Sequence, residues 1–144
     1  TPGDKWKRTE KKDIVEIMAA HRIPYAATAN IAYPADLERK IRKAVSIRGG
    51  LRFIHLYSPC PTGWGFSPDL SVKMARMAVQ SRAFPLYEVE NGFKYTLGES
   101  GDLPISDYLR AQNRFRHLTG GDLEIIQGRV DQEWKRLERR AAEF

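Results

Sequence analysis

A strand–helix–strand pattern between residues 25 and 58 constrains the fold of this chain most strongly. Residues 25–29 (YAATA) form a short apolar run directly after Pro24, which predicts a buried strand. Residues 34–48 begin with a proline, place apolar side chains three and four positions apart, and end at a Gly-Gly pair, as a helix does. Residues 51–58 (LRFIHLYS) predict a second strand. The short links between these elements predict a βαβ crossover with two neighbouring parallel strands, and therefore an α/β fold.

The only cysteine of the chain lies in the loop that follows the second predicted strand. Cys60 stands between Pro59 and Pro61, and glycines follow it, so the backbone is held in a defined turn. One interpretation is a buried free cysteine that acts as a small hydrophobe. The other is a metal ligand whose companion ligands lie elsewhere, because α/β sheets bind ligands at the carboxyl edge of their strands. A cysteine hydrolase is disfavoured, since nothing in the pattern brings a histidine base such as His55 to the sulfur.

A second polar group lies at the same predicted edge, where Thr28 and Asn30 end the first strand. Such side chains often only hydrogen-bond to the loop backbone, but their position also makes them candidates for ligand binding. The chain has no glycine-rich phosphate loop and no HExxH motif. His21, His55 and His117 are scattered, which favours structural roles for all three.

The rest of the chain is predicted to contain one hairpin and several helices. Asn91-Gly92, between two alternating segments, is a strong hairpin signal. Thr119 followed by Asp122 resembles a capping box and opens a long helix. Other helices are predicted at residues 10–22, 68–82 and 105–118. We divide the chain into residues 1–83, with the crossover and the cysteine loop, and residues 84–144, a hairpin and helical extension of the same domain.

The charge of the chain has two interpretations. Its 144 residues include 24 Lys+Arg and 18 Asp+Glu, a net charge of +6, which invites nucleic-acid binding. However, acids and bases alternate in DLERKIRKAV and DQEWKRLERR, as on a solvated helix face, so a nucleic-acid-binding module is the weaker interpretation. No apolar run reaches the ~20 residues of a membrane span, and a lone cysteine suits a reducing cytoplasm. The start at Thr1, without a methionine, suggests a cut end or a fragment.

Four blocks of the chain together resemble a known family. The blocks are AAHRIPYAATANIAYPADLERKIRKA, FIHLYSPCPTGWGFSPD, FPLYEVENGFKYTL and NRFRHLTGGDLEIIQGRVDQEWKRL. In this order they are similar to the C-terminal half of the β subunit of pyruvate and related 2-oxoacid:ferredoxin oxidoreductases, from about Thr1 to Leu137. The segment PCPTGWGF is the most specific. The resemblance implies part of a doubly wound, mainly parallel sheet of the thiamine-diphosphate-binding type.

The resemblance also implies cofactors. The β subunits of this family bind thiamine diphosphate, Mg²⁺ and a [4Fe–4S] cluster. Cys60 matches the fourth cluster ligand, while the other cysteines and the metal motif lie upstream in the family and are lacking in this chain. Thr28 and Asn30 become candidates for lining the thiamine pocket. Candidate hydrogen-bond donors to the cluster sulfurs are the backbone N–H groups of Thr62, Gly63 and Trp64.

The activity that the resemblance implies belongs to a larger complex. The complete enzyme is expected to decarboxylate a 2-oxoacid, with pyruvate favoured, to form an acyl-CoA from coenzyme A, and to pass electrons through clusters to ferredoxin. This chain alone is expected to be inactive. Its expected partners are the rest of the β subunit and other subunits, against which the C-terminal helix with Trp134 packs. A non-catalytic interaction fragment, such as a split subunit that only completes a partner, is the alternative. No nucleic-acid or membrane partner is expected.

Overall fold

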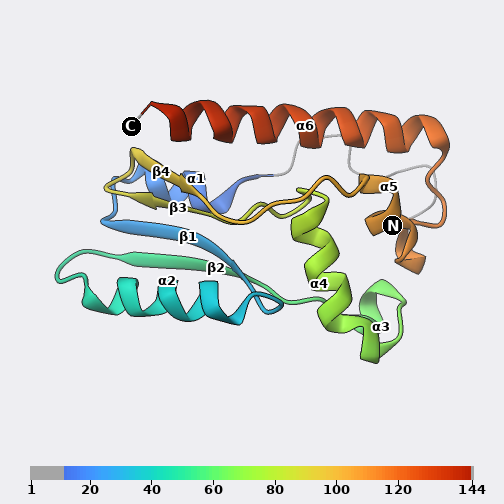
Figure 1. The fold of residues 1–144 in the computed structure, drawn as a ribbon, viewed down its shortest axis with the longest axis horizontal. Helices are drawn as coiled ribbons and strands as arrows, with labels where there is room; N and C mark the ends of the chain where they lie inside the picture. Colours follow the sequence, from blue (N-terminus) through green and yellow to red (C-terminus); the bar gives the residue numbers. More distant parts are fainter. Residues whose placement is uncertain (1–11, 144) are drawn as a thin grey trace.

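The computed structural model describes residues 12–143 and shows an α/β fold built on one four-stranded sheet (Figure 1). The fold class expected from the sequence is therefore confirmed. In chain order the elements are α1 (Ile14–Ala20), β1 (Tyr25–Asn30), α2 (Pro34–Ser46), β2 (Arg52–Tyr57), α3 (Pro61–Trp64), the 3₁₀ helix η1 (Pro68–Leu70), α4 (Ser71–Gln80), β3 (Tyr87–Glu90), β4 (Lys94–Leu97), α5 (Ile105–Arg110), the 3₁₀ helix η2 (Asn113–Phe115) and α6 (Gly120–Ala142).

The sheet has the strand order β2-β1-β3-β4. Strands β1 and β2 are parallel, in register from Tyr25 opposite Arg52 to Asn30 opposite Tyr57, and α2 connects them. The predicted βαβ crossover is thus confirmed. The β1–β3 and β3–β4 pairs are antiparallel, so the mainly parallel sheet that we expected is not found in the described part of the chain.

Two local features explain the antiparallel strands. Helix α4 lies beyond the carboxyl ends of β1 and β2 (Figure 1), so the chain enters β3 from that end of the sheet and runs back. The predicted hairpin then reverses the chain again. Asn91 and Gly92 both have positive φ, 53° and 81°, which these two residue types adopt more readily than others.

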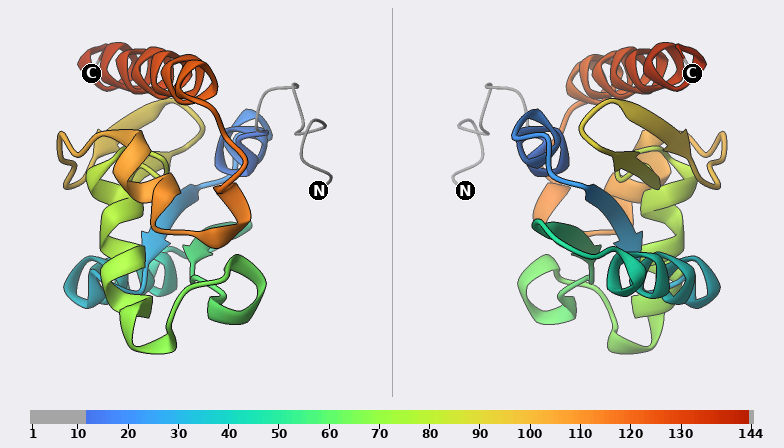
Figure 2. Two further views of the ribbon diagram at one scale, coloured as in Figure 1. Left: turned by 90° about the vertical axis from the view of Figure 1, so that its right-hand side faces the viewer. Right: turned by 90° about the vertical axis from the view of Figure 1, so that its left-hand side faces the viewer.

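Helices cover both faces of the sheet. Helix α2 lies on one face, and α1 and α6 lie on the other (Figures 1 and 2). Buried side chains of α1, the sheet and α6 form one core cluster, which includes Val15, Tyr87, Val89 and Leu137. A second cluster joins α4, α5 and the start of α6 beyond the carboxyl ends of the parallel strands. No helix within residues 12–143 combines the length and the apolar character that crossing a membrane requires.

Helix α6 packs on its own chain. The predicted capping box is confirmed: the Thr119 hydroxyl accepts a hydrogen bond from the Asp122 N–H at 3.3 Å, and the Asp122 carboxylate accepts one from the Thr119 N–H at 2.9 Å. Trp134 is buried, and the Arg82 guanidinium lies 5.0 Å from its ring centroid. The expectation that Trp134 packs against another polypeptide is therefore wrong, because its ring is covered within this chain.

Helix α2 meets the sheet through charged side chains. Lys40 is fully buried, and its Nζ lies 2.7 Å from the carboxylate of Asp36. Burial lowers the pKa of Lys40 from its usual value, although the hydrogen bond and charge of Asp36 oppose this effect. Glu88 of β3 is also buried and accepts hydrogen bonds from Arg39 at 3.0 Å and Lys43 at 3.3 Å. The alternating charges of this segment thus form a helix–sheet contact, and the expectation of a solvated face is wrong here.

Candidate functional site

The residues singled out from the sequence lie near the carboxyl ends of the two parallel strands. Thr28 and Asn30 are in the last part of β1, and Cys60 follows β2 by a short link. Figure 1 shows α3 and α4 beyond this end of the sheet. This is the edge at which α/β sheets bind ligands, so the topology places the candidates where the sequence predicted them.

The cysteine loop presents its sulfur to the surface. Cys60 is exposed and precedes the first turn of α3, whose Trp64 N–H donates to the Cys60 carbonyl at 3.0 Å. The interpretation of Cys60 as a buried hydrophobe is therefore wrong. A Cβ added at Gly63 would lie 3.3 Å from the Cys60 Sγ, which is tight for such a contact. The sulfur thus rests against a glycine that leaves room for it.

The backbone donors near the sulfur are fewer than predicted. The Trp64 N–H already donates a hydrogen bond to the Cys60 carbonyl, so it is no longer a candidate donor to a ligand. Thr62 and Gly63 belong to the first turn of α3. N–H groups in a first turn lack an intrahelical partner, so these two remain candidates.

A guanidinium stacks on the cysteine loop from a distant part of the sequence. The Arg114 Cζ lies 3.9 Å from the centroid of the Trp64 ring and 4.5 Å from that of Phe115. Its Nε and Nη2 donate to the Gln112 side-chain oxygen at 2.9 and 2.7 Å. Burial lowers the pKa of Arg114, and no carboxylate of the described residues forms an ion pair with it. Arg114 therefore places a positive charge against the Trp64 end of the cysteine loop.

The sequence did not point to Arg114. The predicted helix over residues 105–118 is interrupted after α5, where Gln112 adopts an extended backbone with φ −122° and ψ 119°. The Gln112 side chain is fully buried and donates to the Tyr108 carbonyl at 2.8 Å. The Asn113 N–H then donates to the Gly65 carbonyl at 3.3 Å, which ties the two loops together. The only available signal was a basic residue beside an aromatic one, which is too common to identify a site.

Aromatic side chains support the loop from the sheet side. Tyr57 ends β2, and its ring centroid lies 5.8 Å from that of Trp64 and 4.8 Å from that of Phe84. The Tyr57 and Tyr108 hydroxyls are hydrogen-bonded to each other. Burial, with the neighbouring Tyr108 as a further cause, raises the pKa of Tyr57 above its ordinary value, so this phenol stays neutral at physiological pH. His55 is edge-on to Phe84 with ring centroids 5.3 Å apart.

The two polar residues of β1 are turned to the interior. The Thr28 hydroxyl donates to the Pro85 carbonyl and accepts from the Tyr87 N–H, both at 2.8 Å. Asn30 is fully buried; it donates to the Ala75 carbonyl at 2.9 Å and accepts from the Ala32 N–H at 2.8 Å. These bonds connect β1 to the segment before β3, to α4 and to its own loop. The lining of a thiamine pocket by Thr28 and Asn30 stays a prediction.

We expect Thr28→Val to destabilise the protein by roughly 1–3 kcal/mol, the usual cost of leaving buried main-chain groups without a partner. The valine would leave the Tyr87 N–H and the Pro85 carbonyl unsatisfied at nearly unchanged volume. Urea unfolding of the variant and of Thr28→Ser, which keeps the hydroxyl, measures this effect. Equal stability of Thr28→Val and the parent protein would contradict the assigned role of the hydroxyl.

The described residues do not form a complete metal site by themselves. Residues 12–143 contain no group of three or more His, Cys, Asp or Glu side chains that could hold a metal ion together. One accessible thiol fits a contribution of one thiolate to an anionic cluster. It does not fit a cluster held by these residues alone.

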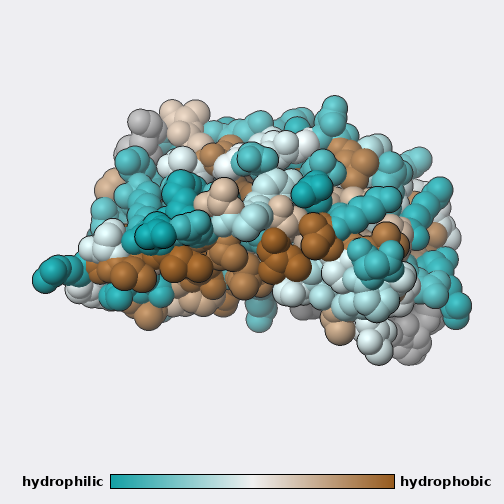
Figure 3. All heavy atoms as spheres, turned by 60° about the horizontal axis from the view of Figure 1, so that its bottom comes forward, coloured by the Kyte–Doolittle hydropathy of each residue, from teal (hydrophilic) through white to brown (hydrophobic). Residues whose placement is uncertain are grey.

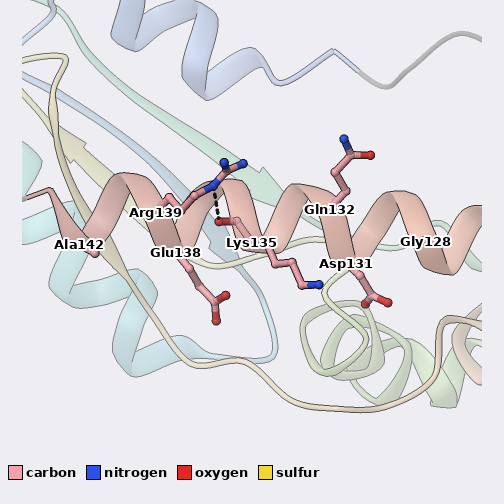
Figure 4. Close-up of a pocket in the computed structure, with 7 residues that line it drawn as sticks. All are labelled: Gly128, Asp131, Gln132, Lys135, Glu138, Arg139 and Ala142. Atoms are coloured by element: carbon pink, nitrogen blue, oxygen red, sulfur yellow. Dashed lines mark hydrogen bonds between the residues drawn. The ribbon is translucent and has the colours of Figure 1, made fainter.

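A hollow on α6 does not compete with this site. It is lined by Gly128, Asp131, Gln132, Lys135, Glu138, Arg139 and Ala142, which all belong to the one helix (Figure 4). The bond from Arg139 to the Lys135 carbonyl, 3.4 Å long, stays within the helix surface. A ligand here would meet one wall only, whereas small-molecule sites enclose most of a ligand's surface.

Comparison with known proteins shows similarity to subunits of 2-oxoacid oxidoreductases; no family model matches the chain. It is 45% identical to ketoisovalerate oxidoreductase subunit VorB of Pyrococcus abyssi over 151 aligned residues, 100% of this chain and 48% of that protein. It is 49% identical to pyruvate synthase subunit PorB of Methanocaldococcus jannaschii, over 88% of this chain and 43% of that protein. It is 40% identical to the beta subunit of the NADH-dependent phenylglyoxylate dehydrogenase of Aromatoleum evansii, over 92% of this chain and 30% of that protein. The chain spans about half the length of the first two relatives.

Proposed function

Since this chain is homologous over its whole length to part of the β subunits of 2-oxoacid oxidoreductases, as the resemblance indicated, we propose that it works within such an enzyme. The proposed reaction is the oxidative decarboxylation of a 2-oxoacid to an acyl-CoA, with ferredoxin as electron acceptor. Thiamine diphosphate with Mg²⁺ supplies the decarboxylation chemistry and a [4Fe–4S] cluster supplies one-electron transfer when they are bound. The observation that carries the proposal is the homology together with an exposed, positioned thiol at the functional edge.

The direct part of this chain is to hold one iron of the cluster through Cys60. Pro59 and Pro61 restrict the backbone on both sides, and the stacked Trp64 and Arg114 fix the loop against η2. Arg114, stacked on Trp64 of the same loop, brings a positive charge that would attract an anionic iron–thiolate centre. Thr62 and Gly63 direct first-turn N–H groups that can donate to cluster sulfurs. The other thiolate ligands of the cluster would come from polypeptide outside this sequence, because the sequence has no second cysteine.

Pyruvate is the substrate that we propose first. The relatives are named for pyruvate, ketoisovalerate and phenylglyoxylate, which differ in the group beyond the 2-oxoacid. All three share the carboxylate and the adjacent carbonyl on which the reaction acts. We propose that parts of the enzyme outside this chain select the substrate by the group attached to its 2-oxoacid portion.

The test is an assay of the assembled enzyme that contains this chain. We expect reduction of ferredoxin, or of a viologen dye, that requires a 2-oxoacid, coenzyme A and thiamine diphosphate together. Omission of any one of the three provides the control. A complex that binds its partners but shows no such reaction with any 2-oxoacid would instead support the alternative, a non-catalytic interaction fragment.

Nucleic-acid binding loses support from the structure. Arg39, Lys40 and Lys43 are engaged with Asp36 and Glu88, and Arg136 contacts Glu16 at 2.6 Å. Positive side chains that form ion pairs with carboxylates are less available to bind the phosphates of a nucleic acid, although the chain keeps a positive net charge.

A further inference from the structure

The cysteine loop has little buried surface of its own to hold it. Helix α3 of this loop is a single turn of four residues with no buried member, and so short a helix is not stable by itself. Figure 3 shows a hydrophobic band over α2 and β2, whereas the end of the molecule that carries α3 is paler and thus more polar. The exposed apolar side chains of α2, β2 and the segment between them are Ile41, Val45, Leu51 and Leu56. The turn that presents Cys60 therefore depends on contacts with another part of the chain.

Three residues far along the sequence supply these contacts. They are Gln112, Asn113 and Arg114, and we call them the η2 segment. The Asn113 N–H donates to the Gly65 carbonyl at 3.3 Å. Gly65 has a φ of 71°, and a Cβ added to it would lie 2.6 Å from the Asn113 Cβ, closer than two unbonded carbon atoms approach. The η2 segment thus lies directly against the end of α3.

The guanidinium of Arg114 is fixed from two directions. Its Cζ lies 3.9 Å from the centroid of the Trp64 ring, and both Nε and Nη2 donate to the Gln112 side-chain oxygen. Gln112 is fully buried, and its side-chain nitrogen donates to the Tyr108 carbonyl at 2.8 Å. A buried amide therefore holds the guanidinium, and the guanidinium holds the Trp64 ring.

Trp64 connects this arrangement to the residue that carries the sulfur. Its N–H donates to the Cys60 carbonyl at 3.0 Å, and this bond closes the turn of α3. On its other contacts the ring meets Tyr57 and Phe66, with centroids 5.8 and 6.2 Å away. A Trp64 ring that loses its guanidinium has more freedom to move, and its N–H bond to Cys60 then opens more often. A change at Arg114 is transmitted to Cys60 by this route.

We propose that Arg114, held by Gln112, is the positioning residue that fixes the cysteine loop and keeps Cys60 in the orientation required by an iron of the cluster. The identity of the ligand at Cys60 rests on the proposed function, whereas the contacts of the η2 segment involve no iron. The planar guanidinium is required, because it stacks on an indole and directs two N–H groups to one oxygen. A lysine would keep the charge but neither of these contacts.

Hydrogen exchange in the assembled enzyme measures the positioning without reference to iron. The N–H groups of Trp64, Gly65 and Phe66 are bonded within the turn at 3.0, 2.8 and 3.2 Å. We expect Arg114→Met, which keeps an apolar stem but loses the donors, to speed their exchange roughly tenfold. Tenfold corresponds to 1.4 kcal/mol, and a stacked guanidinium contributes an amount of this order. Unchanged exchange in the turn, or equally faster exchange in β1, would overturn the proposal.

The cluster itself provides a second readout. We expect Arg114→Met to release iron to a chelator roughly tenfold faster and to broaden the electron paramagnetic resonance signal of the reduced cluster, because the thiolate is held in several orientations. Arg114→Lys should behave like Arg114→Met, and recovery of the parent signal by lysine would overturn the proposal, since charge alone would then suffice. Arg116→Met, at an exposed arginine two positions further on, is the matched control and should change neither property.

A double variant tests the link between the two side chains of the η2 segment. Gln112→Leu should speed exchange in the turn in the same way, and adding Arg114→Met should increase the effect little, because both remove one connected set of contacts. Fully additive effects would contradict the role of Gln112.

Cys60→Ser separates the positioning role from the proposed function. If Cys60→Ser removes the cluster but Arg114→Met alters neither exchange nor iron release, only the positioning role fails. If the cluster survives Cys60→Ser while Arg114→Met still speeds exchange in the turn, the cluster role of Cys60 fails and Arg114 remains the residue that holds the loop.

Discussion

Replacement of Cys60 by serine in the assembled enzyme is expected to abolish or degrade one iron–sulfur cluster. The iron content should fall by about four atoms per copy of this chain, because a [4Fe–4S] cluster relies on thiolate at each iron. A serine hydroxyl is a far weaker ligand at neutral pH, since it remains protonated where a thiol ionises. Electron transfer from the 2-oxoacid to ferredoxin should be lost together with the cluster. The subunits should still assemble.

Iron and sulfide analysis, together with electron paramagnetic resonance of the reduced enzyme, measures this loss. Thr62→Ser, in the same loop, is the matched control because it changes a neighbouring exposed side chain and keeps the thiol. The loop itself is held by Pro59, Trp64 and Arg114, so the serine variant should keep its backbone. Normal iron content and a normal resonance signal in Cys60→Ser would remove the cluster assignment and with it the direct role of this chain.

Replacement of Glu88 by glutamine is expected to destabilise the protein by about 3 kcal/mol, at the lower end of the range for breaking a buried ion pair. Glu88 joins β3 to both neighbours: its Oε2 accepts from the Tyr25 hydroxyl at 2.5 Å, and its Oε1 from Arg39 and Lys43 at 3.0 and 3.3 Å. The lower end applies because the two cations keep other carboxylate partners, with Lys43 3.0 Å from Glu90. Urea unfolding at pH 7 measures the difference. Glu38→Gln, which alters an exposed pair with Arg42, should change stability by less than ~1 kcal/mol.

The same carboxylate should make stability depend on pH. Burial alone would raise the pKa of Glu88, but hydrogen bonds from Tyr25 and Arg39 and the charge of Lys43 outweigh it and hold the pKa below its ordinary value. A lowered pKa in the folded state stabilises the protein above the unfolded pKa of about 4.3, and this stabilisation disappears as the pH falls through the folded pKa. Unfolding free energies between pH 7 and pH 3 should thus fall more steeply for the parent protein than for Glu88→Gln. Parallel pH profiles would contradict this role of Glu88.

Local patterns in the sequence predicted local structure well. The apolar run after Pro24, the proline-initiated helix and the second apolar run identified the βαβ unit, since each depends on neighbouring residues only. The Asn91-Gly92 turn and the Thr119–Asp122 capping box were confirmed for the same reason. The cysteine loop was placed at the carboxyl edge correctly, because the direction of a strand determines the edge at which its loop emerges.

The failures concern residues whose neighbours lie far along the chain. The alternating charges of α2 looked solvated, yet Lys40 is buried and Glu88 of β3 completes the contact. The predicted helix over residues 105–118 breaks at Gln112, which carries Arg114 onto the ring of Trp64. Periodicity describes which side chains share a face, but not which partner that face meets.

By itself, the sequence determined the crossover, the turn that presents Cys60 and the kinship with 2-oxoacid oxidoreductase subunits. Only the tertiary structure decided that β3 and β4 run antiparallel, that the charged side of α2 faces the sheet and that its apolar side remains open beside β2. The physical reason is that strand direction and helix orientation are set by pairing and burial between distant segments. The free energies of strand pairing and of side-chain burial depend on contacts between segments that are far apart in the sequence, and a single stretch of residues does not contain those contacts.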